Sequence, residues 1–263
     1  MVPGDALIVH FAYHKAMTFF FKKVYSDVAR MFNWHHKHHN GDLNGFYEDV
    51  LNSKKPAIIS VNNRLVEFDR LPPYTGTHLI RDPRDLLISG FRYHKWCKEP
   101  WAHETMDAAF VSRFNLDKTI VRQKAMGKTY QEFLNTLDDV EGLKLEMSLR
   151  TSHFNTMQQW NYKNANILEL KYEDIFGNEV QIFRKILQHH GFPRHVIKRC
   201  LKVVRKYTFK ALTEKGKTGN QKHASKGTSK QWQKLLPEEI KCLFKDKYGD
   251  LLINIGYEKD YNW

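Results

Sequence analysis

Short hydrophobic runs alternate along the chain with stretches in which apolar residues recur at helical spacing. A short apolar run bounded by turn residues is typical of a buried strand, and recurrence every three or four residues is typical of an amphipathic helix. The sequence therefore predicts strands at 6–12, 57–61, 77–80 and 167–172. It predicts helices at 18–32, 84–95, 129–137, 149–162, 178–190, 194–205 and 237–255.

Local signals support this division. Thr129 and Glu132 have the spacing of a capping box, and Gly191 stands where a helix would end. Strands interleaved with helices predict an α/β fold, with a central and mostly parallel sheet flanked by helices. No repeat or linker divides the chain, so we expect one domain over residues 1–263. In such folds, ligands bind at the carboxyl ends of the strands.

The charge balance suggests an anionic partner. The chain has 42 Lys and Arg against 29 Asp and Glu, a net charge of +13, with a pI near 9.5. This surplus favours nucleotides, nucleic acid, acidic glycans or anionic lipid as partners, although a plain basic surface would have the same composition. No nucleic-acid-binding signature is present, so we expect no specific nucleic-acid partner.

Cysteine usage and hydropathy indicate the compartment. The three cysteines, Cys97, Cys200 and Cys242, are widely spaced. An odd number without paired spacing argues against a disulfide framework and a structural zinc site. We see no signal peptide, and His10, His14 and Lys15 interrupt the first apolar stretch before it could span a bilayer. We therefore expect a cytoplasmic protein without a transmembrane segment.

The segment FAYHKAMTFFFKKVY, residues 11–25, joins the first predicted strand to the first predicted helix. Nucleotide-binding proteins place a phosphate loop here, yet this one has no glycine and no Walker pattern. Lys15 offers a charge, Thr18 a hydroxyl, and the helix terminus unpaired N–H groups, all of which suit a phosphate. Taken alone, the segment is more simply explained as a strand that turns into a helix.

A second segment, HLIRDPRDLLISGFRYH, also passes from a strand into a helix. Arg81 ends the strand, and Ser89 lies two turns into the helix that begins near Arg84. A strand-end arginine can hold a phosphate in a bidentate manner, and a serine that faces back can complete the site. Alternatively, Arg81 and Asp82 form a local ion pair and Ser89 is a packing residue.

Together, these two segments resemble the sulfotransferases that use 3′-phosphoadenosine 5′-phosphosulfate (PAPS). Three further segments fit that family in the right order: LKYED (170–174), YTFKAL (207–212) and SKGTSKQW (225–232). The resemblance implies a fold related to the nucleotide kinases, with PAPS as donor and 3′,5′-adenosine bisphosphate (PAP) as product. It implies that the nucleotide contacts Lys15, Ala16, Met17, Thr18, Phe19, Arg81, Ser89, Tyr172, Thr208, Phe209, Ser225, Lys226 and Gly227.

The sequence also departs from the family's pattern. Ala16-Met17-Thr18 replaces the usual Ser-Gly-Thr, and Ser225 stands where arginine is common. Lys230 takes the place of the second glycine of the C-terminal loop. Cytosolic members have a catalytic histidine at the end of a strand where this chain has Asn62-Asn63-Arg64.

The resemblance makes Lys15 the residue that stabilises the departing phosphate. An acceptor hydroxyl also needs a base with a pKa near the working pH, which points to His or Glu. Our first candidate is His94, and His103, Glu67, Glu99 and Glu104 remain open. The acceptor, a hydroxyl or amine on a small molecule, lipid or glycan, is not identified by the sequence.

Two polar stretches call for a separate interpretation. HHKHH (35–39) invites a metal interpretation, but adjacent histidines rarely converge on one ion, so we expect a basic surface loop and no metal site. The lysine-rich stretch 213–230 is either a solvated connection or a loop that closes over an anion. An ATP-dependent phosphotransferase and a basic nucleic-acid-binding protein remain the competing functions.

Overall fold

The computed structural model describes residues 7–53, 56–121, 125, 127–214 and 229–263. These residues divide into two compact units. The first unit comes from residues 1–81 and 160–227, and the second from residues 82–159 and 228–263. The expected single domain stays a prediction.

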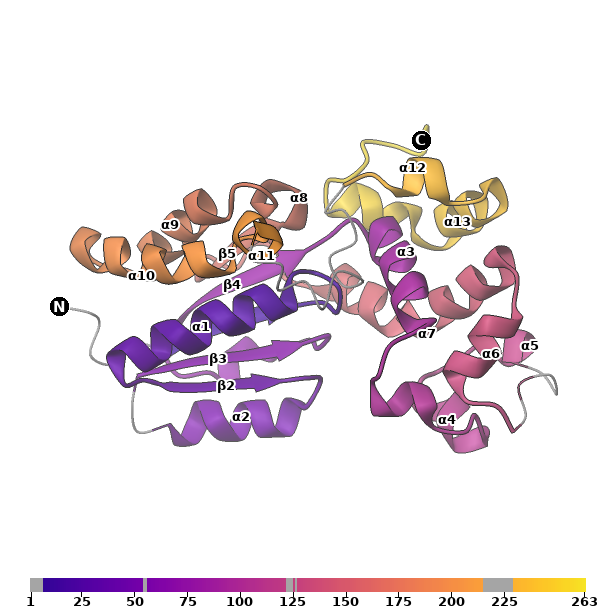
Figure 1. The fold of residues 1–263 in the computed structure, drawn as a ribbon, viewed down its shortest axis with the longest axis horizontal. Coiled ribbons are helices and arrows are strands. Elements are labelled where there is room, and N and C mark those ends of the chain that lie inside the picture. Colours follow the sequence, from indigo (N-terminus) through magenta and orange to yellow (C-terminus); the bar gives the residue numbers. More distant parts are fainter. Residues whose placement is uncertain (1–6, 54–55, 122–124, 126, 215–228) are drawn as a thin grey trace. The chain divides into compact units, whose positions relative to one another are not determined.

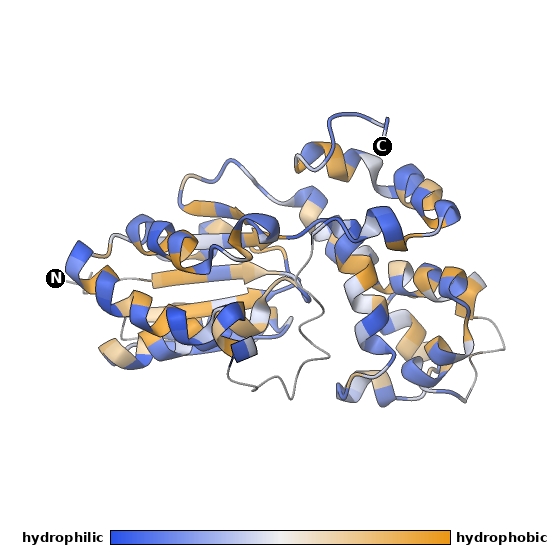
Figure 2. Ribbon diagram, turned by 45° about the horizontal axis from the view of Figure 1, so that its top comes forward, coloured by the Kyte–Doolittle hydropathy of each residue, from blue (hydrophilic) through white to orange (hydrophobic). Residues whose placement is uncertain are grey.

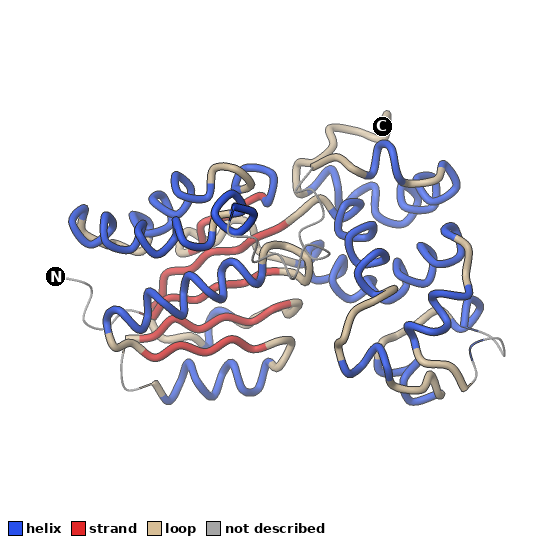
Figure 3. Tube along the Cα trace, in the orientation of Figure 1, coloured by secondary structure: helices blue, strands red, loops and turns tan. Residues whose placement is uncertain are grey.

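The first unit is built around a parallel sheet of five strands in the order β2-β3-β1-β4-β5 (Figures 1 and 3). The strands are β1 (Leu7–Ala12), β2 (His35–His39), β3 (Ala57–Asn62), β4 (Tyr74–Ile80) and β5 (Ile167–Lys171). All four pairings are parallel, as the alternation of strands and helices predicted. In Figure 2 the central strands are largely orange, because apolar side chains point from both faces into the flanking layers.

Helices cover both faces of this sheet. The helices of the first unit are α1 (Thr18–Phe32), α2 (Leu43–Asn52), α8 (Tyr172–Ile175), α9 (Glu179–His189), α10 (Arg194–Tyr207) and α11 (Phe209–Glu214), with a 3-10 turn at Phe68–Arg70. One hydrophobic cluster joins α1, α9 and α10 to one face. A second joins α2 and Trp160 to the other.

The second unit is helical. It contains α3 (Pro83–His94), α4 (Ala108–Arg113), α5 (Lys118–Val121), α6 (Tyr130–Thr136), α7 (Asp139–Gln159), α12 (Trp232–Leu235) and α13 (Glu238–Asn254), with a 3-10 turn at Pro100–His103. The predicted capping box is present: Thr129 accepts from the Glu132 N–H, and the Glu132 carboxylate accepts from the Thr129 N–H. Gly90 lets α3 approach a buried ion pair on α7, since a Cβ there would lie 2.1 Å from Glu146 Oε1.

Several sequence-based boundaries were wrong. HHKHH is not a loop but the edge strand β2, which is half-buried and pairs with β3. The predicted helix at 149–162 is the second half of the longer α7, and β4 begins at Tyr74 rather than at residue 77. Helix α2, whose N-cap Asp42 accepts from the Gly45 N–H, was not predicted from the sequence.

Candidate functional site

The loop between β1 and α1 has the backbone of an anion-binding turn although it contains no glycine. Lys15 and Met17 both have positive φ angles, 73° and 52°. A left-handed conformation costs a residue with a side chain about 1–3 kcal/mol, and such strain concentrates at functional sites. The Ala16 side chain is fully buried, and its N–H donates to the Tyr13 carbonyl at 3.0 Å. These contacts hold the loop in the strained conformation.

The N-terminus of α1 suits an anion. Its N-cap residue, Met17, makes no side-chain cap hydrogen bond, and the first turn has no acidic residue. The first N–H groups of a helix need partners, and the helix dipole favours negative charge there. The Thr18 hydroxyl donates to the Tyr13 carbonyl at 3.4 Å. Thr18 lies beside Phe19, an aromatic side chain that is 56% exposed.

Arg81 connects three of the sequence-predicted site segments. It lies directly after β4 and is buried, and its Nη1 donates to the Lys15 carbonyl at 3.0 Å. Its guanidinium lies 4.3 Å from the centre of the Tyr172 ring, at the end of β5. Arg81 Nε has no hydrogen-bond partner among the described residues. An arginine nitrogen buried without a partner is costly, so this atom is suited to an anionic ligand.

An aromatic chain extends the site from Tyr172. The Tyr172 ring stacks with Phe176 at 6.1 Å between centroids, and Phe176 contacts the Phe209 ring at 4.9 Å. The Phe209 N–H donates to the buried Glu179 at 3.2 Å, which fixes the start of α11. Thr208, the residue before α11, accepts from the Ala211 N–H at 3.2 Å. The predicted adenine-side residues Tyr172, Thr208 and Phe209 therefore belong to one connected region.

Asn63 is a further residue of the candidate site that was not among those predicted from the sequence. It has a φ of 58°, its N–H donates to the Ala12 carbonyl at 3.0 Å, and its side-chain oxygen accepts from the His14 N–H at 2.8 Å. This asparagine therefore ties the end of β3 to the loop after β1. In the sequence, this segment stands out only because it lacks a histidine.

A polar cluster of Glu169, His78 and Trp160 supports the same loop from the α2 side of the sheet. The Glu169 carboxylate accepts from Trp160 Nε1 at 2.9 Å and contacts His78 Nδ1 at 2.7 Å. The His78 ring stacks on Trp160 at 3.8 Å between centroids and meets the Tyr13 ring edge-on at 5.6 Å. Burial raises the pKa of Tyr13 well above its usual value, so its hydroxyl stays protonated.

The second unit contains Ser89 and the end of the predicted C-terminal loop. Ser89 lies half-buried on α3, and its contact with the nucleotide stays a prediction. The buried Asp85 carboxylate accepts from the Lys230 N–H at 2.8 Å and the Trp232 N–H at 2.9 Å. The chain that follows the predicted loop is therefore anchored on the first turn of α3. Ser225, Lys226 and Gly227 lie outside the described residues.

Asp82, which the alternative interpretation paired with Arg81, forms an ion pair with Arg84 in the second unit. Asp82 accepts from Nε and Nη2 of Arg84 at 3.0 and 2.8 Å. The Arg84 guanidinium lies 3.6 Å from the centre of the Trp232 ring and 4.5 Å from that of Trp263. Arg84 therefore links the start of α3 to the C-terminal segment.

His94, the first candidate for the base, is deeply buried on α3. It is 1% exposed, and its Nδ1 lies 2.8 Å from Glu146 Oε2, beside Arg150. Burial lowers the pKa of His94, partly offset by Glu146, so the imidazole is neutral near pH 7. Glu99, a second candidate, accepts from the Tyr93 hydroxyl at 2.9 Å and from Trp101 Nε1 at 2.6 Å.

His103, Glu104 and Glu67, the remaining candidate bases, are less enclosed. His103 Nε2 lies 3.0 Å from the Cys97 carbonyl. Glu104 forms an ion pair with Arg113, and the exposed Glu67 lies 3.7 Å from Arg70. None of these contacts selects one residue as the base, so the assignment stays a prediction.

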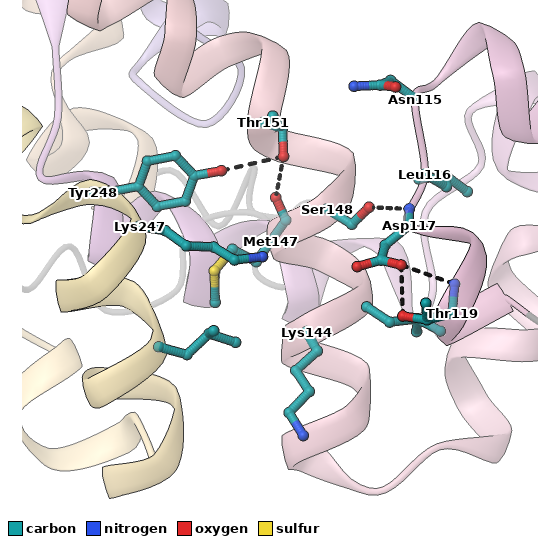
Figure 4. Close-up of a pocket in the computed structure, with 12 residues that line it drawn as sticks. Asn115, Leu116, Asp117, Thr119, Lys144, Met147, Ser148, Thr151, Lys247 and Tyr248 are labelled. Atoms are coloured by element: carbon teal, nitrogen blue, oxygen red, sulfur yellow. Dashed lines mark hydrogen bonds between the residues drawn. The ribbon is translucent and has the colours of Figure 1, made fainter.

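A pocket of about 420 Å³ lies in the second unit, between α7, α13 and the turn before α5 (Figure 4). Figure 4 shows the Tyr248 hydroxyl directed at Thr151 and the Ser148 hydroxyl directed at the Asp117 backbone, at 3.2 and 2.6 Å. No sequence-predicted site residue lines this pocket.

The histidines of β2 pair with a carboxylate. His35 Nε2 and His39 Nε2 contact the two oxygens of Asp49 at 3.1 and 2.9 Å. In the part of the chain that the structure describes, no group of three or more His, Cys, Asp or Glu side chains could hold a metal ion. Within the same residues, no helix is long and apolar enough to cross a bilayer.

A parallel sheet covered by helices, with a loop suited to an anion after its first strand, is typical of proteins with a P-loop-like fold. The profile of the sulfotransferase domain family matches residues 77–256, more than half of the chain. The chain therefore belongs to the sulfotransferase domain family, as the sequence motifs predicted.

A solved structure agrees on the fold. The structure of mouse sulfotransferase SULT7A1 complexed with PAP is similar, with 16% identity, a TM-score of 0.54, and coverage of 94% of this chain and 84% of that chain. Retinol dehydratase in complex with androsterone and the inactive cofactor PAP has 14% identity and a TM-score of 0.49, with coverage of 94% and 80%. No curated protein sequence matches the chain.

Proposed function

We propose that this protein transfers the sulfuryl group of PAPS to a hydroxyl or amine of an acceptor. One observation carries the proposal: the buried guanidinium of Arg81 bonds the Lys15 carbonyl and lies over the Tyr172 ring. Two segments that the family resemblance assigns to the 5′-phosphate and to the adenine are thus held together by a third. All three lie at the carboxyl edge of a parallel sheet, where this class of fold binds its ligands.

Each group then has a role in the reaction. The Lys15 ammonium and the N–H groups at the start of α1 stabilise the charge that develops on the leaving phosphate. Arg81 binds a phosphate of the nucleotide, while Tyr172 and Phe209 border its adenine ring. The acceptor oxygen or nitrogen forms a bond to sulfur as the bond from sulfur to the phosphate oxygen breaks, and PAP leaves with that electron pair. The acceptor's proton passes to a base.

We keep His94 as the first candidate for this base. Its neutral imidazole has the protonation state that a base needs, and Glu146 fixes the orientation of the ring. Replacement by Gln keeps the size and polarity of the side chain but removes the basic nitrogen. If His94→Gln retains full turnover, the search passes to Glu99 and His103.

A binding assay tests the donor. We expect PAP to raise the melting temperature of the protein, because a ligand that binds only the folded state stabilises it by mass action. Lys15→Ala and Arg81→Ala should remain folded and lose this response, while Lys163→Ala, an exposed lysine after α7, should keep it. Stabilisation by ATP with Mg²⁺ and not by PAP would contradict the proposal, as would a salt-steep response to oligonucleotide alone.

The acceptor and the compartment complete the proposal. A screen with labelled PAPS against alcohols, phenols, amines, lipids and glycans would identify the acceptor class. We propose that the protein acts in the cytoplasm, which is supported by its cysteines: Cys97, Cys200 and Cys242 are all free thiols.

A further inference from the structure

Three neighbouring helices of the first unit carry most of the protein's net positive charge. In this layer α10 packs against both α9 and α1, on one face of the sheet (Figure 1). The three helices contain eleven lysines and arginines but only two carboxylates, Asp27 and Glu179. They therefore contribute +9 to a total of +13. We call the outward side of these three helices the basic face.

The central helix, α10, has the densest charge. It has six basic residues and no acidic one, and all six are exposed: Arg194, Lys198, Arg199, Lys202, Arg205 and Lys206. Among the described residues, no carboxylate lies within salt-bridge distance of any of them. The inward side of the helix is apolar, and Val196, Cys200 and Val204 are buried in the core. Every turn of α10 thus presents a cation to the outside.

Only Arg205 and Lys206, in the last turn of α10, interact favourably with the helix dipole. Arg194 and Lys198 lie in its first turns, where the helix dipole disfavours cations. Lys198, Lys202 and Lys206 follow one another at i,i+4 spacing, at which like charges repel. An anion outside the protein would relieve this repulsion.

The shape and chemistry of the basic face indicate that its partner is an extended anionic surface rather than a single strand of a polyanion. Its cations spread over three adjacent helices, whereas a single linear polyanion would contact one line of them. Of the exposed large hydrophobic side chains, none lies on α9 or α10, and only Phe19 lies on α1. The face thus lacks the series of aromatic side chains on which single-stranded nucleic acid stacks. Clusters of four to eight Lys and Arg on one helical face are typical of contact with anionic lipid.

We propose that the basic face docks electrostatically on an anionic phospholipid surface. The contact needs no insertion of apolar side chains, because long lysine and arginine side chains reach the head groups directly. It is therefore reversible and weakens as salt screens the charges. The proposal does not depend on the donor or the acceptor of the transfer reaction.

Co-sedimentation with vesicles tests the docking. We expect the protein to sediment with vesicles of phosphatidylcholine that contain about one third phosphatidylserine, and to stay in solution with phosphatidylcholine alone. The triple variant Lys198→Gln/Lys202→Gln/Lys206→Gln should lose roughly a hundredfold in affinity, at about fivefold for each cation near the membrane. A control, Lys118→Gln/Lys163→Gln/Lys259→Gln, removes the same charge from exposed positions outside the basic face and should bind like the parent protein.

The outcomes are decisive in both directions. Equal binding by the triple variant and the control would show that net charge alone matters, and would overturn the basic face as the docking surface. Absence of wild-type binding to the phosphatidylserine vesicles would also overturn it, including a result in which the protein binds only a sulfated polysaccharide or an oligonucleotide. Circular dichroism and the PAP-induced thermal shift establish that each variant is folded with its nucleotide site intact.

Discussion

Replacement of Arg81 by methionine tests the central connection of the site. Methionine fills a similar volume and remains compatible with a buried position, but it removes the donor to the Lys15 carbonyl and the cation over the Tyr172 ring. Arg81→Lys keeps the charge and lacks the planar fork that reaches both groups. The pair of variants separates the geometry of the guanidinium from its charge.

The structure sets the size of the expected effect. A hydrogen bond from a charged donor contributes about 1.5–3 kcal/mol, and a partly buried cation–π contact about 0.5–2 kcal/mol. The variant no longer buries a guanidinium, and this gain in free energy offsets part of the loss of the hydrogen bond and the cation–π contact. We therefore expect Arg81→Met to lower the free energy of unfolding by about 1–2 kcal/mol, or roughly 2–8 °C in melting temperature.

The effect on PAP binding should be larger than the effect on stability. Loss of a charged contact to a phosphate, at about 2–3 kcal/mol, weakens affinity roughly 30- to 150-fold. Isothermal titration calorimetry with PAP measures this affinity, and Arg92→Met removes an exposed guanidinium from α3 as a control. Arg81→Lys should fall between the parent protein and Arg81→Met. The reasoning is refuted if Arg81→Met binds PAP as tightly as the control.

Three further predictions concern the stability of the fold. Gly90→Ala places a Cβ against the buried Glu146 carboxylate, and should cost at least about 3 kcal/mol, or roughly 6–12 °C in a thermal melt, while Ser152→Ala changes little. Glu169→Gln removes the charge from the His78 and Trp160 contacts, and we expect the free energy of unfolding, measured by urea denaturation, to fall by about 1–2 kcal/mol. An unchanged denaturation midpoint would exclude a stabilising role for this polar cluster. Burial lowers the pKa of His190 to about 3, so the unfolded state binds more protons below pH 6.5, and stability falls as the pH falls towards 3. Between pH 7 and pH 5 this histidine should cost about 2 kcal/mol, and a His190→Gln variant with the same pH dependence would rule out this source.

The sequence predicted those parts of the fold that depend on local hydrophobic pattern. Four of the five strands were visible because each contains a run of apolar residues, and β3 is buried throughout its length. The fifth, β2, was missed because its residues are histidines and a lysine, which carry no apolar signal. Its strand conformation depends on pairing with β3, a contact that local pattern does not encode.

The candidate site also has features that could be predicted from the sequence and features that could not. The meeting of Lys15, Arg81 and Tyr172 could be predicted because each residue follows a strand, and the strands are parallel. The anchoring of Trp232 on Asp85 could not, because it joins residues far apart in the sequence through a backbone N–H that every residue except proline possesses. The left-handed conformation at Met17 was also hidden, since the residue type itself disfavours it.

The interleaving of the two units dictates the order in which the molecule can form on the ribosome. β4 pairs with β5 in register from Gly76 with Ile167, yet the chain between them builds helices of the second unit. β1, β3 and β4 are synthesised first and must wait, with the β4 edge unpaired, until those helices have emerged. Tyr172 comes from the ribosome only after β5, so the wall of the site against which Arg81 rests is added late. A nascent chain stopped before β5 would present an open strand edge, and this makes the interval between β4 and β5 a stage of synthesis that is exposed to aggregation.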